Sequence, residues 1–207
     1  MVGEAQVSDQ STKSTIASSD VIDLSLDRAG VRPKHKRMTW ETFRLPDDQG
    51  VSADVSAFID WNPKEDDAKM AFLCGPPGTG KTHMAVAKIR DGIERGARGA
   101  LFIVVPELLA NMRDGFKDGS ARGVLDQAKY AKFLVLDDLG AEMATDWVRD
   151  TLYMLINNRD NGLRPTVVTS NLNPGEIAAS HHERLASRLA SGLVVDTSGE
   201  KDYRIGK

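Results

Sequence analysis

The chain has 207 residues, of which 41% are hydrophobic and 6% aromatic, so it is long enough for one domain with a packed core. Its formal net charge of −3 excludes a globally basic nucleic-acid binder, although a local basic patch remains compatible with contacts to phosphates. The single cysteine, Cys74, excludes an internal disulfide and a cysteine-rich metal site. Without a secretory signal or an apolar stretch of membrane-spanning length, the sequence predicts a soluble, cytoplasmic protein with no membrane partner.

The N-terminal segments differ in composition from the rest of the chain. Residues 1–27 are rich in Ser, Thr, Gln and Asp, which predicts a disordered tail or a docking tail. Within them, apolar and acidic side chains alternate over residues 21–26. This pattern is compatible with a short docking element or with a solvated linker. Residues 28–37 carry five Lys or Arg side chains and no acid, which suits either a basic segment that abuts phosphates or DNA, or a solvated charge run.

From about Thr39 the chain alternates strand-like and helix-like segments, which predicts an α/β fold with five mostly parallel strands and flanking helices. Short apolar runs predict strands at residues 70–74, 100–105, 133–136, 166–169 and 193–195. Helical spacing and stop signals predict helices from Gly80 to about Arg95, over 107–118, 121–130 and 146–158, and short helices after the fourth strand.

A phosphate-binding loop follows the first predicted strand. It reads Gly75-Pro76-Pro77-Gly78-Thr79-Gly80-Lys81-Thr82 and leads directly into a predicted helix. Its small residues let backbone N–H groups surround phosphate oxygens at the helix N-terminus, and Lys81 adds a positive charge at the β- and γ-phosphates. Thr82 offers a hydroxyl oxygen to Mg²⁺, so the motif predicts that ATP or GTP binds together with Mg²⁺.

An acidic pair, Asp137 and Asp138, ends the third predicted strand, at the edge where open α/β sheets bind ligands. Because alternate residues of a strand face opposite sides, the two carboxylates are expected to do different work. Asp137 is predicted to hold Mg²⁺, directly or through water, and Asp138 to polarise the attacking water. A simple Asp-Asp turn after a strand is the alternative.

Two later segments offer further polar groups. In a sheet where the fourth strand lies beside the first, Asn171 would face the γ-phosphate and could orient water; its alternative is an Asx turn. Arg184 and Arg188 lie four residues apart on one predicted helical face, from which each could reach the γ-phosphate of a neighbouring subunit. A surface helix with a salt bridge to Glu183 explains the same spacing.

Taken together, these segments resemble the AAA+ ATPases of the bacterial DnaC/DnaI-type helicase loaders and of the related IstB-type transposition helpers. The resemblance covers about residues 28–206 and is carried by the lead-in at 30–43 and by residues 72–83, 134–140, 168–172 and 183–189. It implies a P-loop AAA+ core over 70–207, preceded over 28–69 by the basic lead-in and the N-terminal part of the ATPase domain. The chain stops at Lys207, soon after the last predicted strand, so no C-terminal lid domain is expected.

The resemblance also implies roles for single residues. It makes Asn171 a sensor of the γ-phosphate and Arg188 the arginine finger, with Arg184 as the second candidate. Residues 106–131 would correspond to a helical insertion that holds single-stranded DNA, through Arg113, Phe116, Lys117 and Arg122, with a plain surface loop as the alternative. Trp40 and Phe43 would either line the adenine pocket or anchor the packing of the lead-in.

The implied function is that of an ATP-hydrolysing DNA replication protein that loads a ring-shaped replicative helicase. ATP and Mg²⁺ are the implied cofactors, and a nucleotide-dependent homo-oligomer is the implied assembly. One alternative is an ATPase that assists a DNA transposase on duplex DNA. A second alternative is a nucleotide-gated binding module with little turnover.

Overall fold

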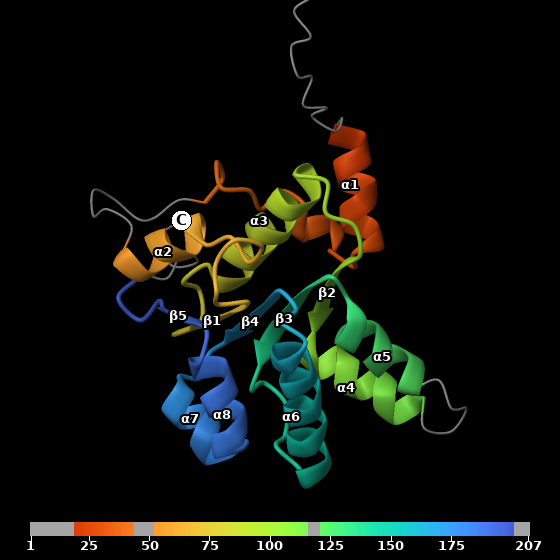
Figure 1. The fold of residues 1–207 in the computed structure, drawn as a ribbon, viewed down its shortest axis with the longest axis vertical. Helices are drawn as coiled ribbons and strands as arrows, with labels where there is room; N and C mark the ends of the chain where they lie inside the picture. Colours follow the sequence, from red (N-terminus) through yellow and green to blue (C-terminus); the bar gives the residue numbers. More distant parts are fainter. Residues whose placement is uncertain (1–18, 44–51, 116–120, 201–207) are drawn as a thin grey trace, which may run out of the picture.

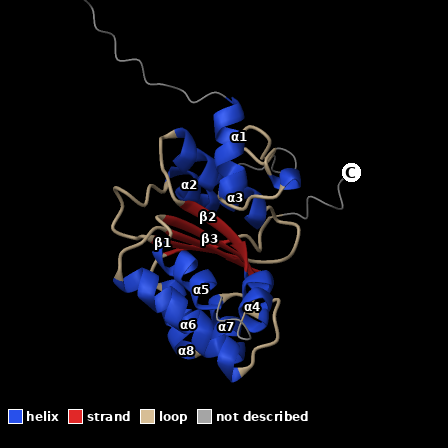
Figure 2. Cartoon of the chain, turned by 90° about the vertical axis from the view of Figure 1, so that its right-hand side faces the viewer, coloured by secondary structure: helices blue, strands red, loops and turns tan. Residues whose placement is uncertain are grey.

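The computed structural model describes residues 19–43, 52–115 and 121–200. In these residues, helices cover both faces of a five-stranded sheet and form a helix–sheet–helix sandwich (Figures 1 and 2). The strand order is β2-β3-β4-β1-β5, and every pair of neighbouring strands is parallel. The predicted α/β class is therefore confirmed, and the sheet expected to be mostly parallel is parallel throughout the described ranges.

The five strands are β1 (Met70–Cys74), β2 (Ala100–Val104), β3 (Phe133–Leu139), β4 (Thr166–Ser170) and β5 (Leu193–Asp196). Each lies where the sequence predicts a strand, although β3 extends through the acidic pair and Val105 belongs to the following helix. The fourth strand does lie beside the first, with Cys74 opposite Ser170. The carboxyl end of β4 is thereby brought next to the start of the phosphate-binding loop.

Three helices lie on one face of the sheet: α1 (Ser19–Arg28), α2 (Ala53–Asp60) and α3 (Lys81–Glu94). A 3-10 turn, η1 (Pro33–His35), belongs to the lead-in. The other face carries α4 (Val105–Asp114), α5 (Ala121–Tyr130), α6 (Asp146–Asn161), α7 (Pro174–Ser180) and α8 (Glu183–Ala190). In the part of the chain that the structure describes, no helix follows β5 and none is long and apolar enough to cross a membrane.

The sheet separates two apolar cores because successive strand residues point to opposite faces. In β1, Phe72 packs in the core beneath α4 to α8, whereas Ala71 and Leu73 pack in the core beneath α1 to α3. Both faces of β1 and β4 are buried along their whole length. This burial explains why β1 is a continuous apolar run rather than an alternating one.

The structure describes the last part of the region predicted to be a disordered or docking tail, residues 1–27. Residues 19–28 form α1, because Ile22 and Leu26 lie four residues apart on one helical face and are buried against α3. Two ion pairs add to this packing, between Asp27 and Lys36 at 2.7 Å and between Asp23 and Arg90 at 3.4 Å. Residues 1–18 of the predicted tail lie outside the described residues.

Candidate nucleotide-binding site

The phosphate-binding loop joins β1 to α3 at the carboxyl edge of the sheet. Gly75, Gly78 and Gly80 have φ angles of 133°, 88° and 89°, in the region that glycine adopts without strain. Gly80 directly precedes Lys81, the first residue of α3. The loop therefore ends at a helix N-terminus, where free N–H groups and the helix dipole favour bound phosphate.

A residue outside the sequence motif supports this loop. Thr197 follows β5; its hydroxyl donates to the Cys74 carbonyl over 2.9 Å and lies 2.7 Å from the hydroxyl of Thr79, and both threonines are buried. A Cβ atom on Gly75 would lie 2.5 Å from the Thr197 hydroxyl, so a larger residue at 75 would clash. The sequence analysis missed Thr197 because its position depends on the pairing of β5 with β1.

The ammonium group of Lys81 lies against the loop. Its Nζ donates to the backbone carbonyl oxygens of Gly75 and Pro76 over 2.7 and 2.6 Å, and the residue is 7% exposed. The positive charge is thus fixed at the loop that would surround the phosphates, as the motif predicts.

Asp137 ends the buried part of β3 and faces the first turn of α3. Its Oδ1 accepts hydrogen bonds from the hydroxyls of Thr82, at 2.9 Å, and Thr169, at 2.8 Å. Burial raises the pKa of this carboxyl, an effect that the two hydroxyl hydrogen bonds oppose. A carboxylate beside the Thr82 hydroxyl supplies hard oxygen donors, which fit Mg²⁺ bound through few protein ligands together with phosphate oxygens.

Asp138 lies next to Asp137 in a different environment. The register of β3 against β4 shifts between Leu136 and Leu139, and Asp138 has a φ of 64°, unusual for a residue other than glycine. Both aspartates line the same cavity, so the strict alternation assumed from the sequence is wrong at this bulge. Asp137 is buried whereas Asp138 is half-buried, so the carboxylates remain chemically distinct.

Asn171 follows β4 and reaches the same cavity. Its Nδ2 lies 3.4 Å from Oδ1 of Asp138, a long hydrogen bond, and the Asp138 backbone N–H donates to the Thr169 hydroxyl over 3.0 Å. Thr169 therefore contacts both aspartates, a link that requires β3 and β4 to be neighbours. The structure brings together Lys81, Thr82 and the three predicted polar residues at the strand ends.

The cavity that these residues line measures about 790 Å³. Arg32 and Lys34 of the basic lead-in line it together with Lys81, and Arg32 also forms an ion pair with Glu107. Phe43 also lines the cavity, whereas Trp40 packs in the core and donates its Nε1 proton to Asp91 over 3.0 Å. The full lining set is Arg32, Lys34, His35, Met38, Thr42, Phe43, Pro77, Gly78, Gly80, Lys81, Thr82, His83, Val104, Asp137, Asp138, Thr169 and Asn171.

The loop after Asp138 is tied to the helix pair that carries the arginines. The carboxylate of Glu142 accepts from the Gly140 N–H, and its Oε1 lies 3.0 Å from Nε2 of the buried His181. Nδ1 of His181 lies 2.9 Å from the hydroxyl of Ser180, the last residue of α7. This buried pair connects the loop beyond β3 with the junction of α7 and α8.

Arg184 and Arg188 do not line the nucleotide cavity of their own chain. Arg188 pairs with Asp160 of α6 over 2.9 Å, instead of with Glu183 in its own helix, and Arg184 is exposed. The role of either arginine at a neighbouring subunit stays a prediction.

The predicted DNA-binding residues fall on the α4–α5 excursion. Arg113 is exposed in the last turn of α4, with its guanidinium 5.8 Å from the ring centre of Trp147, and Arg122 is exposed in the first turn of α5. Phe116 and Lys117 lie outside the described residues. The DNA contacts of this segment stay a prediction.

Comparison with known proteins agrees with this geometry. The profile of the IstB-like ATP binding protein family matches residues 4–194. The replicative helicase loader DnaC of Escherichia coli K12 is 26% identical over 171 residues, which span 81% of this chain and 69% of that protein. The replicative helicase loader DnaI of Bacillus subtilis is 31% identical over 121 residues, which span 58% of this chain and 38% of that protein.

Solved structures show the same fold. A crystal structure of the DnaC helicase loader superposes with a TM-score of 0.67 and 25% identity, covering 80% of this chain and 99% of that one. Domain III of the Thermotoga maritima replication initiation protein DnaA also gives a TM-score of 0.67, at 22% identity, and covers 80% of this chain and 67% of that one. The AAA+ core and the predicted resemblance are therefore confirmed, and the chain belongs to the family of IstB-like ATP binding proteins, with distant homology to the DnaC and DnaI helicase loaders.

Proposed function

We propose that this protein hydrolyses ATP and uses its nucleotide state to control assembly on DNA as a loader of a ring-shaped replicative helicase. The observation that supports hydrolysis is the single cavity shared by the phosphate-binding loop, Asp137, Asp138 and Asn171. A site that only binds nucleotide needs the loop and Lys81. The additional half-buried carboxylate of Asp138 and the exposed amide of Asn171, at the strand ends, have the chemistry required to act on water.

In the proposed reaction, the loop N–H groups and Lys81 hold the β- and γ-phosphates. Thr82 and Asp137 would hold Mg²⁺, which when bound neutralises charge on the phosphate oxygens. Asp138 accepts a hydrogen bond from the attacking water and orients it toward the γ-phosphorus. The long contact between Asp138 and Asn171 leaves both groups able to turn toward that water.

Arg188 is the proposed arginine finger. It lies outside its own nucleotide cavity, as a residue that acts on a neighbouring subunit must. The Glu142–His181 pair joins the Asp138 loop to the α7–α8 junction, so a change at the γ-phosphate has a packed route to the helix of Arg188. ATP would then be bound between subunits of a homo-oligomer, and hydrolysis would be slow in the isolated chain.

Similarity to DnaC and DnaI, both named replicative helicase loaders, supports the proposed helicase partner. The protein would assemble on single-stranded DNA, which the segment that includes Arg113 and Arg122 would hold. These arginines are exposed, so their charges are accessible to phosphates.

ATP turnover per subunit, measured over a range of protein concentrations with and without single-stranded DNA, tests this proposal. We expect turnover to rise with protein concentration and with DNA, and to fall by about tenfold or more in Arg188→Ala. Arg149→Ala is a matched control, because Arg149 also makes one surface ion pair and its side chain is 38% exposed against 40% for Arg188. A concentration-independent rate that Arg188→Ala leaves unchanged would contradict the shared site.

A second candidate is an ATPase that assists a DNA transposase. The match of the IstB-like family profile to residues 4–194 favours it. The two candidates share the nucleotide chemistry and differ in the DNA and the partner. Stimulation of turnover by duplex rather than single-stranded DNA, with bending of the duplex, would support the transposition role over helicase loading.

A further inference from the structure

A second charged region lies at the amino ends of the strands, at the opposite edge of the sheet from the nucleotide cavity. Two cavities of about 520 and 510 Å³ adjoin there and share Ala97 and Arg98. The basic residues that line them come from separate parts of the chain: Arg28, Lys64, Lys88, Arg95, Arg98 and Lys132. Only Glu65 and Asp91 among the lining residues are acidic, so this region is positive although the chain as a whole is negative.

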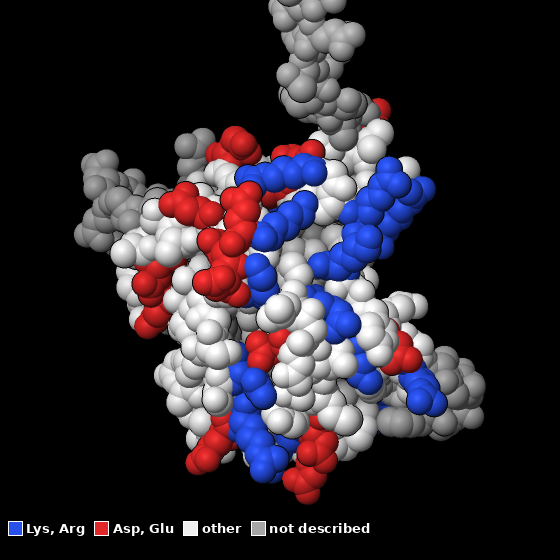
Figure 3. All heavy atoms as spheres, in the orientation of Figure 1, with Lys and Arg blue, Asp and Glu red and all other residues white. Residues whose placement is uncertain are grey.

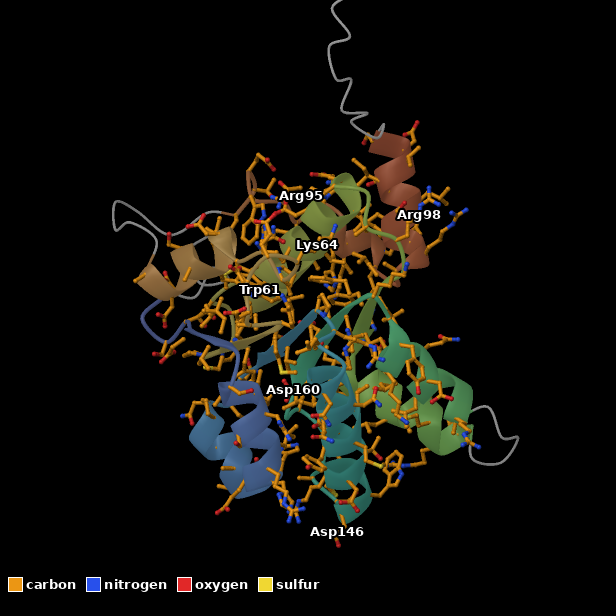
Figure 4. The ribbon with its side chains drawn as sticks, in the orientation of Figure 1. Trp61, Lys64, Arg95, Arg98, Asp146 and Asp160 are labelled. Carbon is orange, nitrogen blue, oxygen red and sulfur yellow. The ribbon has the colours of Figure 1, made fainter. Side chains whose placement is uncertain are left out.

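The basic side chains follow one another across one face of the molecule. Figure 3 shows Lys and Arg gathered over the end of α3 and the adjoining part of α1, beside an acidic area over α2. Figure 4 places Lys64 and Arg95 over the C-terminal half of α3 and Arg98 beside α1. The positive surface therefore extends across several elements.

Four of the six cations differ from Lys88 and Arg95 in their surroundings. Arg28, Lys64, Arg98 and Lys132 are exposed, and none has an ion-pair partner in residues 19–43, 52–115 or 121–200. We call these four residues the amino-edge cations. Lys64, Arg98 and Lys132 line one cavity, and Arg28 and Arg98 line the other, so an anion that binds in either cavity meets at least two unpaired positive charges.

Of the four remaining charged residues that line these cavities, Lys88, Asp91 and Arg95 have structural partners, whereas Glu65 is exposed. The buried Nζ of Lys88 donates to the backbone carbonyls of Ile59 and Trp61, at 2.8 and 3.1 Å. Asp91 accepts from Trp40 and lies 3.8 Å from Arg95, so its charge is already engaged. The amino-edge cations are thus the part of the surface that is available to a ligand.

The backbone beneath these cations is held in place. The Lys132 N–H donates to the Gly99 carbonyl over 2.9 Å, which fixes Arg98 beside Lys132. The Phe102 N–H donates to the Ala29 carbonyl over 2.6 Å, which fixes the end of α1, and Arg28, against β2. A surface whose backbone is already ordered loses little conformational freedom on binding.

The residues that line the two cavities also indicate which class of polyanion would bind there. Trp61 and Phe133 are only 5% and 9% exposed, so the aromatic residues of these cavities offer no open face on which unpaired bases could stack. Recognition would rest on phosphate contacts, which are independent of sequence and suit a duplex with its phosphates on the outside. We propose that the amino-edge cations bind the phosphate backbone of double-stranded DNA.

This surface is separate from the predicted single-strand segment and from the nucleotide site. Arg113 and Arg122 lie on the α4–α5 excursion and line neither amino-edge cavity. The nucleotide cavity lies at the carboxyl ends of the strands, so ATP and duplex DNA can be bound at the same time. The inference does not depend on ATP hydrolysis or on which partner protein is correct.

Fluorescence anisotropy of a labelled random-sequence duplex, titrated with the full chain without nucleotide, tests this proposal. Arg98→Glu/Lys132→Glu is expected to weaken duplex binding by about tenfold or more, and to reduce the slope of log affinity against log salt by about two. Arg149→Glu/Arg184→Glu, at two arginines that line neither amino-edge cavity, changes the net charge equally and is expected to retain the affinity of the unchanged protein. Arg113→Glu/Arg122→Glu tests the α4–α5 excursion as the rival site. ATP binding by each variant, measured separately, reports whether the fold is intact.

Three outcomes would overturn the assignment. Equal losses in Arg98→Glu/Lys132→Glu and Arg149→Glu/Arg184→Glu would show an effect of net charge alone, and a loss confined to Arg113→Glu/Arg122→Glu would place the duplex on the α4–α5 excursion. Tighter binding of the corresponding single strand through Arg98 and Lys132 would overturn the duplex assignment. If the charge reversal disrupts folding, Arg98→Gln/Lys132→Gln gives the same comparison, with Arg149→Gln/Arg184→Gln as its control.

Discussion

Thr79 and Thr197 are 118 residues apart in the chain, and their hydroxyl oxygens lie 2.7 Å apart in the support of the phosphate-binding loop. Both side chains are buried, and Thr197 also donates to the Cys74 carbonyl. The last strand of the sheet therefore helps to hold the loop in its phosphate-binding conformation. This contact makes the segment after β5 part of the nucleotide site.

Replacement of Thr197 by valine is expected to destabilise the protein by about 1–2 kcal/mol. Valine has a similar shape but no hydroxyl, so the buried Thr79 hydroxyl and Cys74 carbonyl each lose a hydrogen-bond partner. ATP binding should weaken as the loop becomes less rigid. Urea unfolding and titration with a fluorescent ATP analogue measure the two effects. Thr197→Ser keeps the hydroxyl and serves as the control; equal behaviour of the valine and serine variants would argue against the support role.

Asp138→Asn is expected to reduce ATP turnover by about a hundredfold while ATP affinity changes little, because the amide retains the shape but is a poor acceptor for a proton from water. Steady-state turnover and equilibrium nucleotide titration separate the two quantities. Asp150→Asn, an exposed substitution on α6, controls for the loss of one negative charge. If Asp138→Asn turns over ATP at the unchanged rate, Asp138 has no role in activating water.

Asp137 is expected to make the nucleotide-free protein less stable as the pH rises. Burial raises the pKa of this carboxyl, so the folded protein retains a proton that the unfolded chain has already lost. Between the ordinary aspartate value and the raised folded value, stability therefore falls with increasing pH, and the full penalty is present above the folded value.

Asp137→Asn keeps an acceptor oxygen for Thr82 and Thr169 and removes the buried charge. We expect it to raise the free energy of unfolding at neutral pH, to flatten the pH dependence in this window, and to weaken Mg²⁺-dependent ATP binding. Denaturant unfolding at several pH values measures the stability, and titration with ATP in the presence and absence of Mg²⁺ measures the binding. Asp114→Asn is the exposed control. A fall in stability at neutral pH would contradict this expectation.

Arg159 is expected to be essential to the packing of α5 and α6 against the sheet. It is fully buried, and burial lowers its pKa to about 9, which leaves it charged at neutral pH. Its guanidinium donates to the Thr166 hydroxyl and to the backbone carbonyls of Ala128, Lys129, Ala131 and Pro165. Arg159→Lys should destabilise the protein by about 3 kcal/mol, because one ammonium group cannot reach all of these acceptors.

Thermal or denaturant unfolding of Arg159→Lys measures this loss. Arg184→Lys is the control, since Arg184 is exposed and the same substitution there removes no buried hydrogen bond. Similar stabilities of the two variants would show that the Arg159 network contributes little.

The amino-acid sequence alone determined the features that depend on neighbouring residues. The phosphate-binding loop is a continuous motif between an apolar run and a helical segment, so Lys81 and Thr82 could be assigned from their positions in it. Four of the five strands were recognisable because each is a short apolar run with a clear end, whereas β4 has only Val167 and Val168 as apolar residues. Asp137 and Asn171 were placed at the site because the carboxyl ends of parallel strands meet at one edge of the sheet.

Only the tertiary structure decided the contacts between segments that are distant in the chain. The bulge in β3 turns Asp138 into the cavity, β5 brings Thr197 beneath the loop, and Asp160 pairs with Arg188 from another helix. The amino-edge cations likewise form one surface only after α1, the α2–β1 and α3–β2 loops and the residue before β3 have packed together. Local patterns specify the elements, but long-range packing sets which side chains meet, because those distances depend on strand order, register and burial.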